Sequence, residues 1–188
     1  PYKIKSILQN IKSMSDYLIL LIKDMDFFSM KTNHSNLKLE RFYVQTDHII
    51  NFCKDITNTL IKKFQKEDNL KLIIEHTNLP KEIYTDEIRL KQILINLLSN
   101  SVKYTNSGFV KLMINHYHDK LKFIVADSGK GIKDEDRDKL FKPFYEMNHD
   151  NYSIGSGLGL CIVKELVELF QGKLIYDTKE NVGTSFEF

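Results

Sequence analysis

The sequence predicts an α+β fold: a two-layer α/β sandwich in which helices cover one face of a mixed sheet, preceded by a bundle helix. Three patterns indicate this architecture. Residues 90–105 place apolar side chains at helical spacing. The chain around that segment alternates between helical patterns and short apolar runs that are typical of strands. Residues 4–28 carry a seven-residue apolar repeat, which is typical of a helix in a bundle.

The N-terminal helix is predicted from two apolar positions that recur every seven residues. These positions hold Ile4, Ile11, Leu18 and Met25, and Ile7, Met14, Leu21 and Phe28. Leu8 and Ile22 widen the stripe and favour a four-helix bundle over a two-stranded seam. One helix cannot bury this stripe, so it needs an upstream helix, a second chain, or the rest of the domain as its partner.

The other elements follow from local composition. Strands are predicted for apolar and β-branched runs at 39–45, 70–76, 109–114, 121–126, 173–177 and 184–188. Helices are predicted at 46–64, 90–105, 133–140 and 158–170. Asp86 can cap the helix that contains residues 90–105, and Gly172 ends the last helix.

Composition restricts the class of protein. The chain has 188 residues and a net charge of +2 with both signs interspersed, which gives no case for nucleic acid. The longest purely apolar run, residues 17–22, is too short to cross a bilayer, so we expect no membrane contact within this fragment. Cys53 and Cys161 are expected to be free thiols in a reducing compartment. We therefore expect a cytoplasmic protein.

Polar residues interrupt the helix at 90–105. Asn96 and Asn100 are four residues apart and share one face, and Lys103 and Tyr104 follow within a turn. Amide oxygens, an ammonium and a ring at one helix end suit a metal-bound phosphate with a base beside it. An asparagine on a helix is also an ordinary surface residue, so this segment alone leaves both interpretations open.

Three further motifs lie downstream. In DSGKGI, residues 127–132, an aspartate at a strand end can accept a hydrogen bond from an exocyclic amine, and glycines allow close approach to a flat ring. GSGLGL, residues 155–160, opens a helix, where free amides favour phosphate. FKPFYEM, residues 141–147, lies between them, and its two phenylalanines either pin a mobile lid or anchor the core. Each motif alone is also compatible with an ordinary turn or loop.

Together and in this order, these motifs resemble the ATP-binding domain of sensor histidine kinases, in the gyrase, chaperone, histidine kinase and mismatch-repair ATPase superfamily. DEIRLKQILINLLSNSVKYT resembles the N box, DSGKGI the first glycine box, FKPFYEM the F box and GSGLGL the second glycine box. The terminal GTSFEF resembles the closing strand. The resemblance covers residues 39–188 nearly end to end and implies a Bergerat-type ATP-binding fold.

The resemblance also implies an organisation and an activity. Residues 1–30 would be part of the dimerisation and histidine-phosphotransfer hairpin, 31–38 a linker, and 39–188 the kinase catalytic domain. The implied protein is a homodimer through the N-terminal helix, and it would be either cytoplasmic or the cytosolic part of a membrane-bound receptor. It would transfer the γ-phosphate of Mg-ATP to a histidine on a dimeric helical bundle in two-component phosphorelay signalling. A response-regulator receiver domain would accept the phosphate next.

Carried over by position, the resemblance implies a nucleotide site. Asn100 looks like the Mg²⁺ ligand, Lys103 like a phosphate contact, and Asp127 like the adenine-reading carboxylate. Asn96 would support the metal–phosphate site, and Gly129 and Gly131 would shape the base pocket. The glycines of GSGLGL would hold the phosphates, and Thr184 would help Asp127 to bind adenine through a water molecule. The implied cofactor-binding residues are Asn96, Asn100, Lys103, Tyr104, Asp127, Gly129, Gly131, Ile132, Gly155, Ser156, Gly157, Leu158, Gly159 and Thr184.

Two departures from the family pattern stand out. No histidine has the context of the family's phosphoacceptor: the six are His34, His48, His76, His116, His118 and His149. No catalytic residue is therefore identified, and we expect the chain to be truncated, or reduced, before the phosphoacceptor helix. The F box carries Glu146 where many relatives have a basic or amide residue, which leaves Lys142 as a candidate for the γ-phosphate.

Two alternative functions remain. Superfamily members that hydrolyse ATP have a water-activating glutamate four residues before the metal-binding asparagine. Here that position is Asn96, and an amide cannot act as a general base. The other alternative is a nucleotide-binding pseudokinase or a dimerising scaffold. The intact motif set argues against it, while the absent histidine keeps it open.

Overall fold

The computed structural model describes most of the chain. The described residues are 38–145 and 157–188, together with part of the N-terminal segment. In that segment they are 7–8, 11–12, 14–15, 18–19, 22 and 24–26, all of them helical. Several predictions therefore lie outside the described residues. They concern Ile4, Leu21 and Phe28 of the apolar repeat, the linker before residue 38, Glu146, Gly155 and Ser156.

The remaining elements occur where the sequence predicts them, with one addition. The helices are α2 (Thr46–Lys63), α3 (Glu87–Tyr104), α4 (Asp134–Arg137) and α5 (Gly159–Leu169). The strands are β1 (Phe42–Gln45), β2 (Leu70–Thr77), β3 (Glu82–Thr85), β4 (Gly108–Tyr117), β5 (Lys120–Asp127), β6 (Ile175–Lys179) and β7 (Gly183–Glu187). The addition is β3, a four-residue strand that pairs only with β1. The helix predicted at 133–140 is shorter, because α4 gives way to turns after Arg137.

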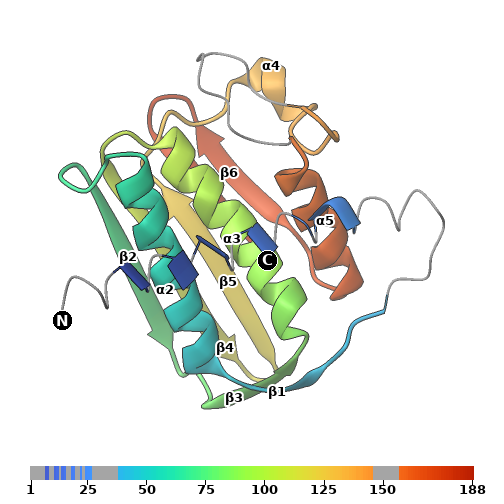
Figure 1. Cartoon of the computed structure of the whole chain (residues 1–188). Coiled ribbons are helices and arrows are strands. Elements are labelled where there is room, and N and C mark those ends of the chain that lie inside the picture. The colour runs from blue at the N-terminus through green and yellow to red at the C-terminus, as the bar shows by residue number, and fades with distance from the viewer. Residues whose placement is uncertain are drawn as a thin grey trace.

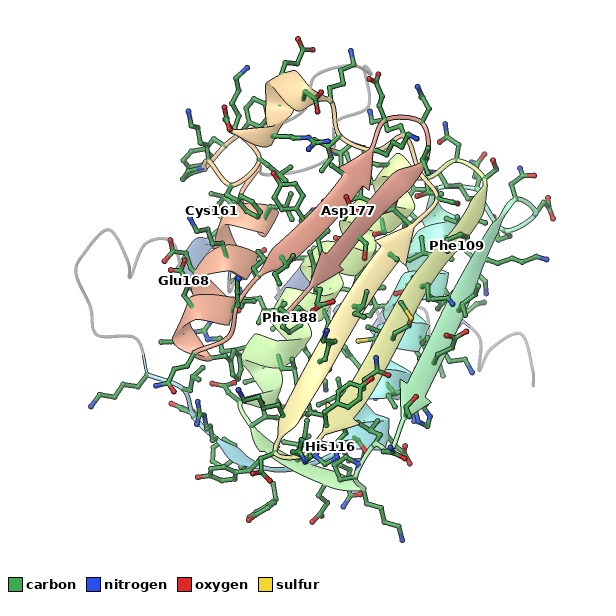
Figure 2. All side chains as sticks on the ribbon, turned by 180° about the vertical axis from the view of Figure 1, so that it is seen from behind. Phe109, His116, Cys161, Glu168, Asp177 and Phe188 are labelled. Atoms are coloured by element: carbon green, nitrogen blue, oxygen red, sulfur yellow. The ribbon has the colours of Figure 1, made fainter. Side chains whose placement is uncertain are left out.

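The main sheet is mixed and has helices on one face. Its strand order is β2-β4-β5-β7-β6, in which β2 and β4 run parallel and the other pairs are antiparallel. The helices α2, α3 and α5 lie against one face, as Figure 1 shows. Among the described residues, no helix lies on the opposite face, which is seen from the front in Figure 2. The predicted two-layer architecture is thus confirmed.

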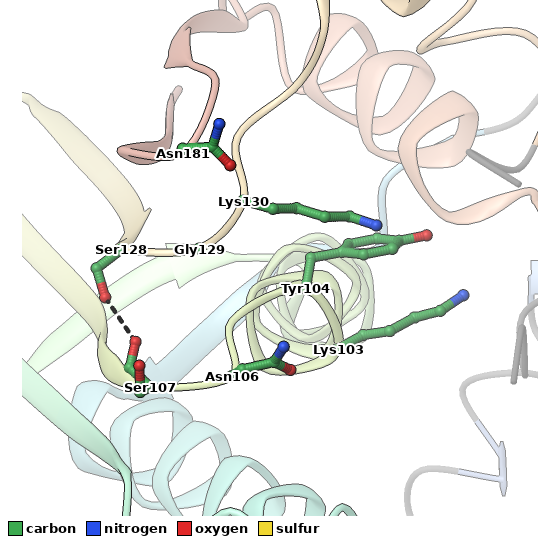
Figure 3. Close-up of a pocket in the computed structure, with 8 residues that line it drawn as sticks. All are labelled: Lys103, Tyr104, Asn106, Ser107, Ser128, Gly129, Lys130 and Asn181. Carbon is green, nitrogen blue, oxygen red and sulfur yellow. Dashed lines mark hydrogen bonds between the residues drawn. The ribbon is translucent and has the colours of Figure 1, made fainter. Parts of the chain in front are cut away.

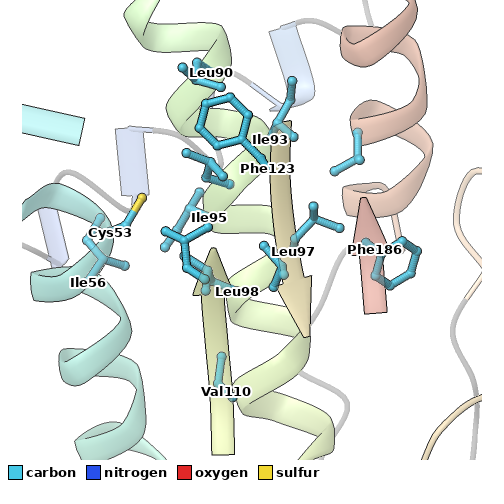
Figure 4. Packing of buried hydrophobic residues seen from close by; sticks show 14 of the residues in the cluster. Cys53, Ile56, Leu90, Ile93, Ile95, Leu97, Leu98, Val110, Phe123 and Phe186 are labelled. Carbon is cyan, nitrogen blue, oxygen red and sulfur yellow. The ribbon is translucent and has the colours of Figure 1, made fainter. Parts of the chain in front are cut away.

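The core is centred on α3, which lies between α2 and α5. Apart from the exposed Ile88, its apolar side chains are almost completely buried against the sheet (Figure 4), notably Leu90, Ile93, Ile95, Leu97 and Leu98. Burying each such side chain contributes roughly 1.5–3 kcal/mol. The predicted N-cap is confirmed, because Asp86 Oδ1 accepts a hydrogen bond from the Arg89 N–H at 3.0 Å. The helix with the polar positions is therefore held on a rigid core.

The end of α5 differs in one detail from the sequence prediction. Gly172 does close the helix, because its N–H donates to the Val167 oxygen at 2.9 Å. The left-handed position, however, belongs to Gln171, whose φ is 62°. The Gln171 N–H also donates to the Glu168 oxygen at 2.9 Å, which completes a Schellman motif in which Gln171 holds the left-handed position that is usually a glycine.

The N-terminal helix contacts the rest of the protein at a polar position. Asp24 is 3% exposed and accepts a hydrogen bond from the Gln92 amide of α3. Burial raises the pKa of the Asp24 carboxyl to about 6. The described apolar side chains of this helix, apart from half-buried Met14, stay exposed: Ile7, Leu8, Ile11, Leu18, Ile19, Ile22 and Met25. Folding back onto the domain therefore does not cover these side chains.

Two observations concern the expected free thiols and the expected lack of membrane contact. Cys53 and Cys161 are both free and buried, and burial raises the pKa of the Cys53 thiol to about 12. Among the described residues, no helix combines the length and the apolar character that crossing a bilayer requires.

Candidate functional site

A small cavity opens where the C-terminal half of α3 meets the end of β5 and the start of β7. It is lined by Asn100, Ser101, Tyr104, Asp127, Gly131, Ile132, Leu140, Leu160, Thr184 and Phe186. Six of these residues were predicted from the motifs. The cavity measures about 30 Å³, which is room for one or two water molecules. A purine ring would require the flanking side chains to move apart.

Asp127 is the acidic group of this cavity. Its Oδ1 accepts a hydrogen bond from the Gly129 N–H, and its Oδ2 accepts one from the Ser101 hydroxyl, both at 2.9 Å. Burial raises the pKa of the Asp127 carboxyl above its ordinary value, while these hydrogen bonds oppose the shift. The carboxylate is thus fixed in orientation and partly desolvated, which suits the recognition of a donor group on a ligand.

Hydroxyl groups of β6 and β7 support the opposite wall. The Thr178 Oγ1 accepts a hydrogen bond from the Ile132 N–H at 2.9 Å and lies 3.0 Å from the Thr184 Oγ1. Both threonines are buried. The pair ties the DSGKGI loop to the last two strands, so that Thr184 and Ile132 are held on the same side of the cavity.

A larger cavity of about 260 Å³ lies beside the small one, and Tyr104 borders both. Its lining is polar, with Lys103, Tyr104, Asn106, Ser107, Ser128, Gly129, Lys130 and Asn181 (Figure 3). The ammonium groups of Lys103 and Lys130 lie 5.1 and 4.9 Å from the centre of the Tyr104 ring. Two cations flanking a ring make this cavity suited to anionic groups.

The N-terminus of α5 packs against Asn96. A Cβ on Gly159 would lie 3.4 Å from the Asn96 Oδ1, and Asn96 itself is 7% exposed. Asn96 lies close enough to Asp24 to oppose the rise in its pKa, yet the Asn96 Nδ2 forms no hydrogen bond with the described residues. Leu158, the N-cap residue of α5, provides no side-chain cap. A buried amide and the start of a helix therefore meet at this point.

Gly157 shows why the second glycine motif needs glycine. Its φ is 65°, and a Cβ there would lie 2.7 Å from the backbone of Phe144. A side chain at this position would overlap with the backbone of Phe144 and Tyr145 in the FKPFYEM segment. Lys142 of that segment is exposed and lines neither cavity.

Two supporting residues were missed. Ser101 places a hydroxyl on the buried face of α3, three residues after Leu98, and that interruption of the apolar stripe was a detectable signal. Thr178 had no comparable signal, because it lies one residue beyond the strand predicted at 173–177 and a threonine there is ordinary. Only the pairing of Thr178 with Thr184 between β6 and β7 reveals its role.

Replacing Gly131 by alanine is expected to lower the free energy of unfolding by roughly 2–4 kcal/mol, through backbone strain and steric overlap. Gly131 has φ 67°, and a Cβ there would lie 2.2 Å from the Lys179 backbone oxygen. Urea unfolding measures the loss. Gly172→Ala is the control, because Gly172 lacks positive φ and its Cβ would approach no atom closer than 3.2 Å. Equal losses would contradict the proposed strain.

Comparisons with known proteins show which family the chain resembles. The family model described as "Histidine kinase-, DNA gyrase B-, and HSP90-like ATPase" matches residues 85–188. Hybrid signal transduction histidine kinase B of Dictyostelium discoideum is 33% identical over 194 residues, which cover 98% of this chain and 10% of that protein. The aerobic respiration control sensor protein ArcB homolog of Haemophilus influenzae is 36% identical over 163 residues, covering 85% of this chain and 48% of that protein.

A solved structure resembles the whole chain. Full-length ShkA in complex with AMPPNP matches with a TM-score of 0.75 and 26% identity, over 98% of this chain and 38% of ShkA. The present chain spans less than half the length of the two curated relatives named above. The family match covers more than half of this chain, from the strand β3 to the final residue. The chain therefore belongs to the family of histidine kinase-, DNA gyrase B- and HSP90-like ATPases.

Proposed function

We propose that residues 39–188 are the catalytic domain of a histidine kinase, which binds Mg-ATP and transfers its γ-phosphate to a histidine on a dimeric helical bundle. Residues 1–30 are then part of that bundle, and 31–38 are the linker. The observation that carries this proposal is the placement of Asp127 and Asn100 at one cavity, with Tyr104 at its border. The histidine kinases among the relatives and the AMPPNP bound to ShkA support it.

Base recognition follows from the Asp127 carboxylate. It is an acceptor held by the Ser101 hydroxyl and the Gly129 N–H. Adenine presents an exocyclic amine, which is a donor, so the two groups are complementary. The Tyr104 ring offers a face for the nucleotide, and the Lys103 ammonium next to it offers a charge for a phosphate.

The residues present also fit a magnesium ion. Asn100 lines the cavity with an amide, whose oxygen is a neutral hard ligand of the kind that Mg²⁺ accepts beside phosphate oxygens. The buried Asn96 amide, with its unsatisfied Nδ2, lies one helical turn earlier. The ion would neutralise charge on the transferring phosphate. The chain's own contribution is to hold the nucleotide and its phosphates in position.

Transfer is favoured over hydrolysis by the position of Asn96. It lies buried beside the N-terminus of α5. The members of the superfamily that hydrolyse ATP have a water-activating glutamate at this position. An amide has no accessible basic pKa, so it cannot take a proton from water. A bound nucleotide would therefore keep its γ-phosphate until a histidine acceptor is presented.

The proposal is tested by binding and by phosphotransfer. Calorimetry should show that the 188-residue chain binds ATP with Mg²⁺, and incubation with labelled ATP should leave no acid-labile phosphohistidine on it. A form extended upstream through the phosphoacceptor helix should acquire the acid-labile label. Absence of nucleotide binding would refute the proposal. Binding without transfer in the extended form would support the pseudokinase alternative, and rapid release of inorganic phosphate would support the hydrolase.

The exposed apolar stripe supports a homodimer through the N-terminal helix. Each large apolar side chain of this stripe that stays exposed loses roughly 1.5–3 kcal/mol of stabilisation that burial would provide. In a form extended upstream of Pro1, Leu18→Glu should dissociate the dimer and leave ATP binding intact, because a charge would enter the seam. Sedimentation velocity measures the change. Lys12→Glu, at an exposed polar position of the same helix, is the control and should remain dimeric. A monomeric extended wild type at micromolar concentration would refute the bundle.

The next acceptor of the phosphate is proposed to be the receiver domain of a response regulator. This follows from the resemblance to histidine kinases of two-component phosphorelays. A phosphorylated extended form should lose its label when incubated with its receiver and Mg²⁺. Retention of the label with every receiver of the source organism would contradict this step.

A further inference from the structure

One lysine beyond the end of α2 holds the end of α3. The Nζ of Lys66 donates to three backbone oxygens, those of Val102 at 2.7 Å, Lys103 at 3.0 Å and Thr105 at 2.8 Å. The last carbonyl groups of a helix have no partner within the helix. An ammonium has three donors, and a cation is favourable at this end of the helix dipole. The Lys66 side chain therefore acts as a C-terminal cap supplied from a different element.

The remaining carbonyl of this segment is held by the glycine loop. The Tyr104 oxygen accepts a hydrogen bond from the Lys130 N–H at 3.2 Å. A Cβ on Gly129 would lie 2.6 Å from that oxygen and 2.7 Å from the Thr105 Oγ1, so the loop packs directly on the helix end. All carbonyls from residue 102 to 105 thus have a partner outside α3. A shift of this segment would be transmitted to the loop that carries Asp127.

The position of Lys66 is itself well determined. Its N–H donates to the Ile61 oxygen at 3.0 Å, and its own carbonyl accepts from the N–H groups of Asn69 and Leu70 at 3.1 and 2.9 Å. The Nζ also lies 5.5 Å from the centre of the Phe64 ring. The ammonium is therefore presented from a rigid turn, so it can determine where the end of α3 lies.

We propose that Lys66 is a positioning residue for the nucleotide site, where it fixes the end of α3 without contacting the nucleotide. This inference rests on the proposed function. Lys103 and Tyr104 belong to the segment that Lys66 holds, and their side chains line the larger cavity (Figure 3). Without the ammonium, three backbone oxygens would lose their partner. The last turn of α3 would then rearrange and move both side chains.

The test compares Lys66→Met, Lys66→Arg and Lys111→Met in the 188-residue chain. Methionine keeps an unbranched stem without donors, and arginine keeps a cation with several donors. Lys111 is the matched control: it is a partly buried lysine whose Nζ lies 3.1 Å from Glu75 on the open sheet face. Three quantities are measured for each variant: affinity for AMPPNP with Mg²⁺, amide hydrogen exchange of residues 100–106, and stability in urea.

The expected result separates position from stability. Lys66→Met should weaken AMPPNP binding about tenfold or more and speed amide exchange at residues 102–105, while Lys66→Arg should restore affinity to within about threefold. Lys111→Met should bind AMPPNP with an affinity within about twofold of wild type, even where it loses as much stability as Lys66→Met. If Lys66→Met does not fold, Lys66→Gln, which retains two neutral donors, is compared in its place.

Two results would overturn the inference. One is a folded Lys66→Met that binds AMPPNP within about twofold of wild type. The other is unchanged exchange at residues 102–105 in that variant. If wild type itself binds no AMPPNP, the proposed function fails and Lys66 can have no role in nucleotide binding. The exchange measurement would then still decide whether Lys66 holds the end of α3.

Discussion

Replacing Asp127 by asparagine should weaken Mg-ATP binding about ten- to hundredfold, which corresponds to the loss of one charged hydrogen bond of roughly 1.5–3 kcal/mol. The carboxylate is already held by the Ser101 hydroxyl and the Gly129 N–H at 2.9 Å, so it faces the small cavity in a fixed orientation. It can accept from the exocyclic amine of adenine. The substituted amide can present its NH₂ group instead, which sets donor against donor.

The same substitution should raise the affinity for GTP relative to ATP, because guanine has an acceptor at that edge. Calorimetric titrations of both nucleotides give the ratio. Asp177→Asn is a matched control: Asp177 is exposed on β6 (Figure 2), which β7 separates from β5, and it lines neither cavity. The control should bind ATP as wild type does. An unchanged ATP:GTP ratio in Asp127→Asn would mean that Asp127 only stabilises its loop.

Replacing Asn100 by alanine should remove most of the increase in ATP affinity that Mg²⁺ provides, about tenfold or more, and should have little effect in EDTA. The Asn100 amide lines the small cavity. Asn96 lies one turn earlier on α3, is buried, and does not line that cavity. Asn100 would hold the ion through its amide oxygen, and alanine offers no oxygen in its place. Asn100→Asp should also impair Mg-ATP binding, because it changes both the charge and the donor set of the site.

The measurement for Asn100 is ATP affinity with and without Mg²⁺, together with urea unfolding to show that the fold survives. Asn115→Ala provides the control, because Asn115 is a half-buried amide on β4 that lines neither cavity. It should retain the full Mg²⁺ effect. If Asn100→Ala also retains it, the metal is held by other groups and Asn100 has no place in the site.

Local periodicity explains why so much of the fold was predictable. The apolar spacing of residues 90–105 predicted α3, and the same residues prove to be buried in the core. Asp86 predicted its N-cap. The small cavity gathers Asn100, Asp127 and Thr184, although 84 positions separate the first from the last along the chain. The sequence predicts that these three residues share one site only because the order of four motifs resembles a known family.

The sequence by itself therefore determined the helices and most strands, because each of those signals lies within a few consecutive residues. It also determined the identity of the polar groups at the end of α3 and in the DSGKGI loop. Tertiary structure alone decided which groups support them. The Ser101–Asp127 contact spans 26 residues, the Lys66–Val102 contact 36 and the Ile132–Thr178 contact 46. Such hydrogen bonds depend on helix docking and strand register, which no local pattern encodes.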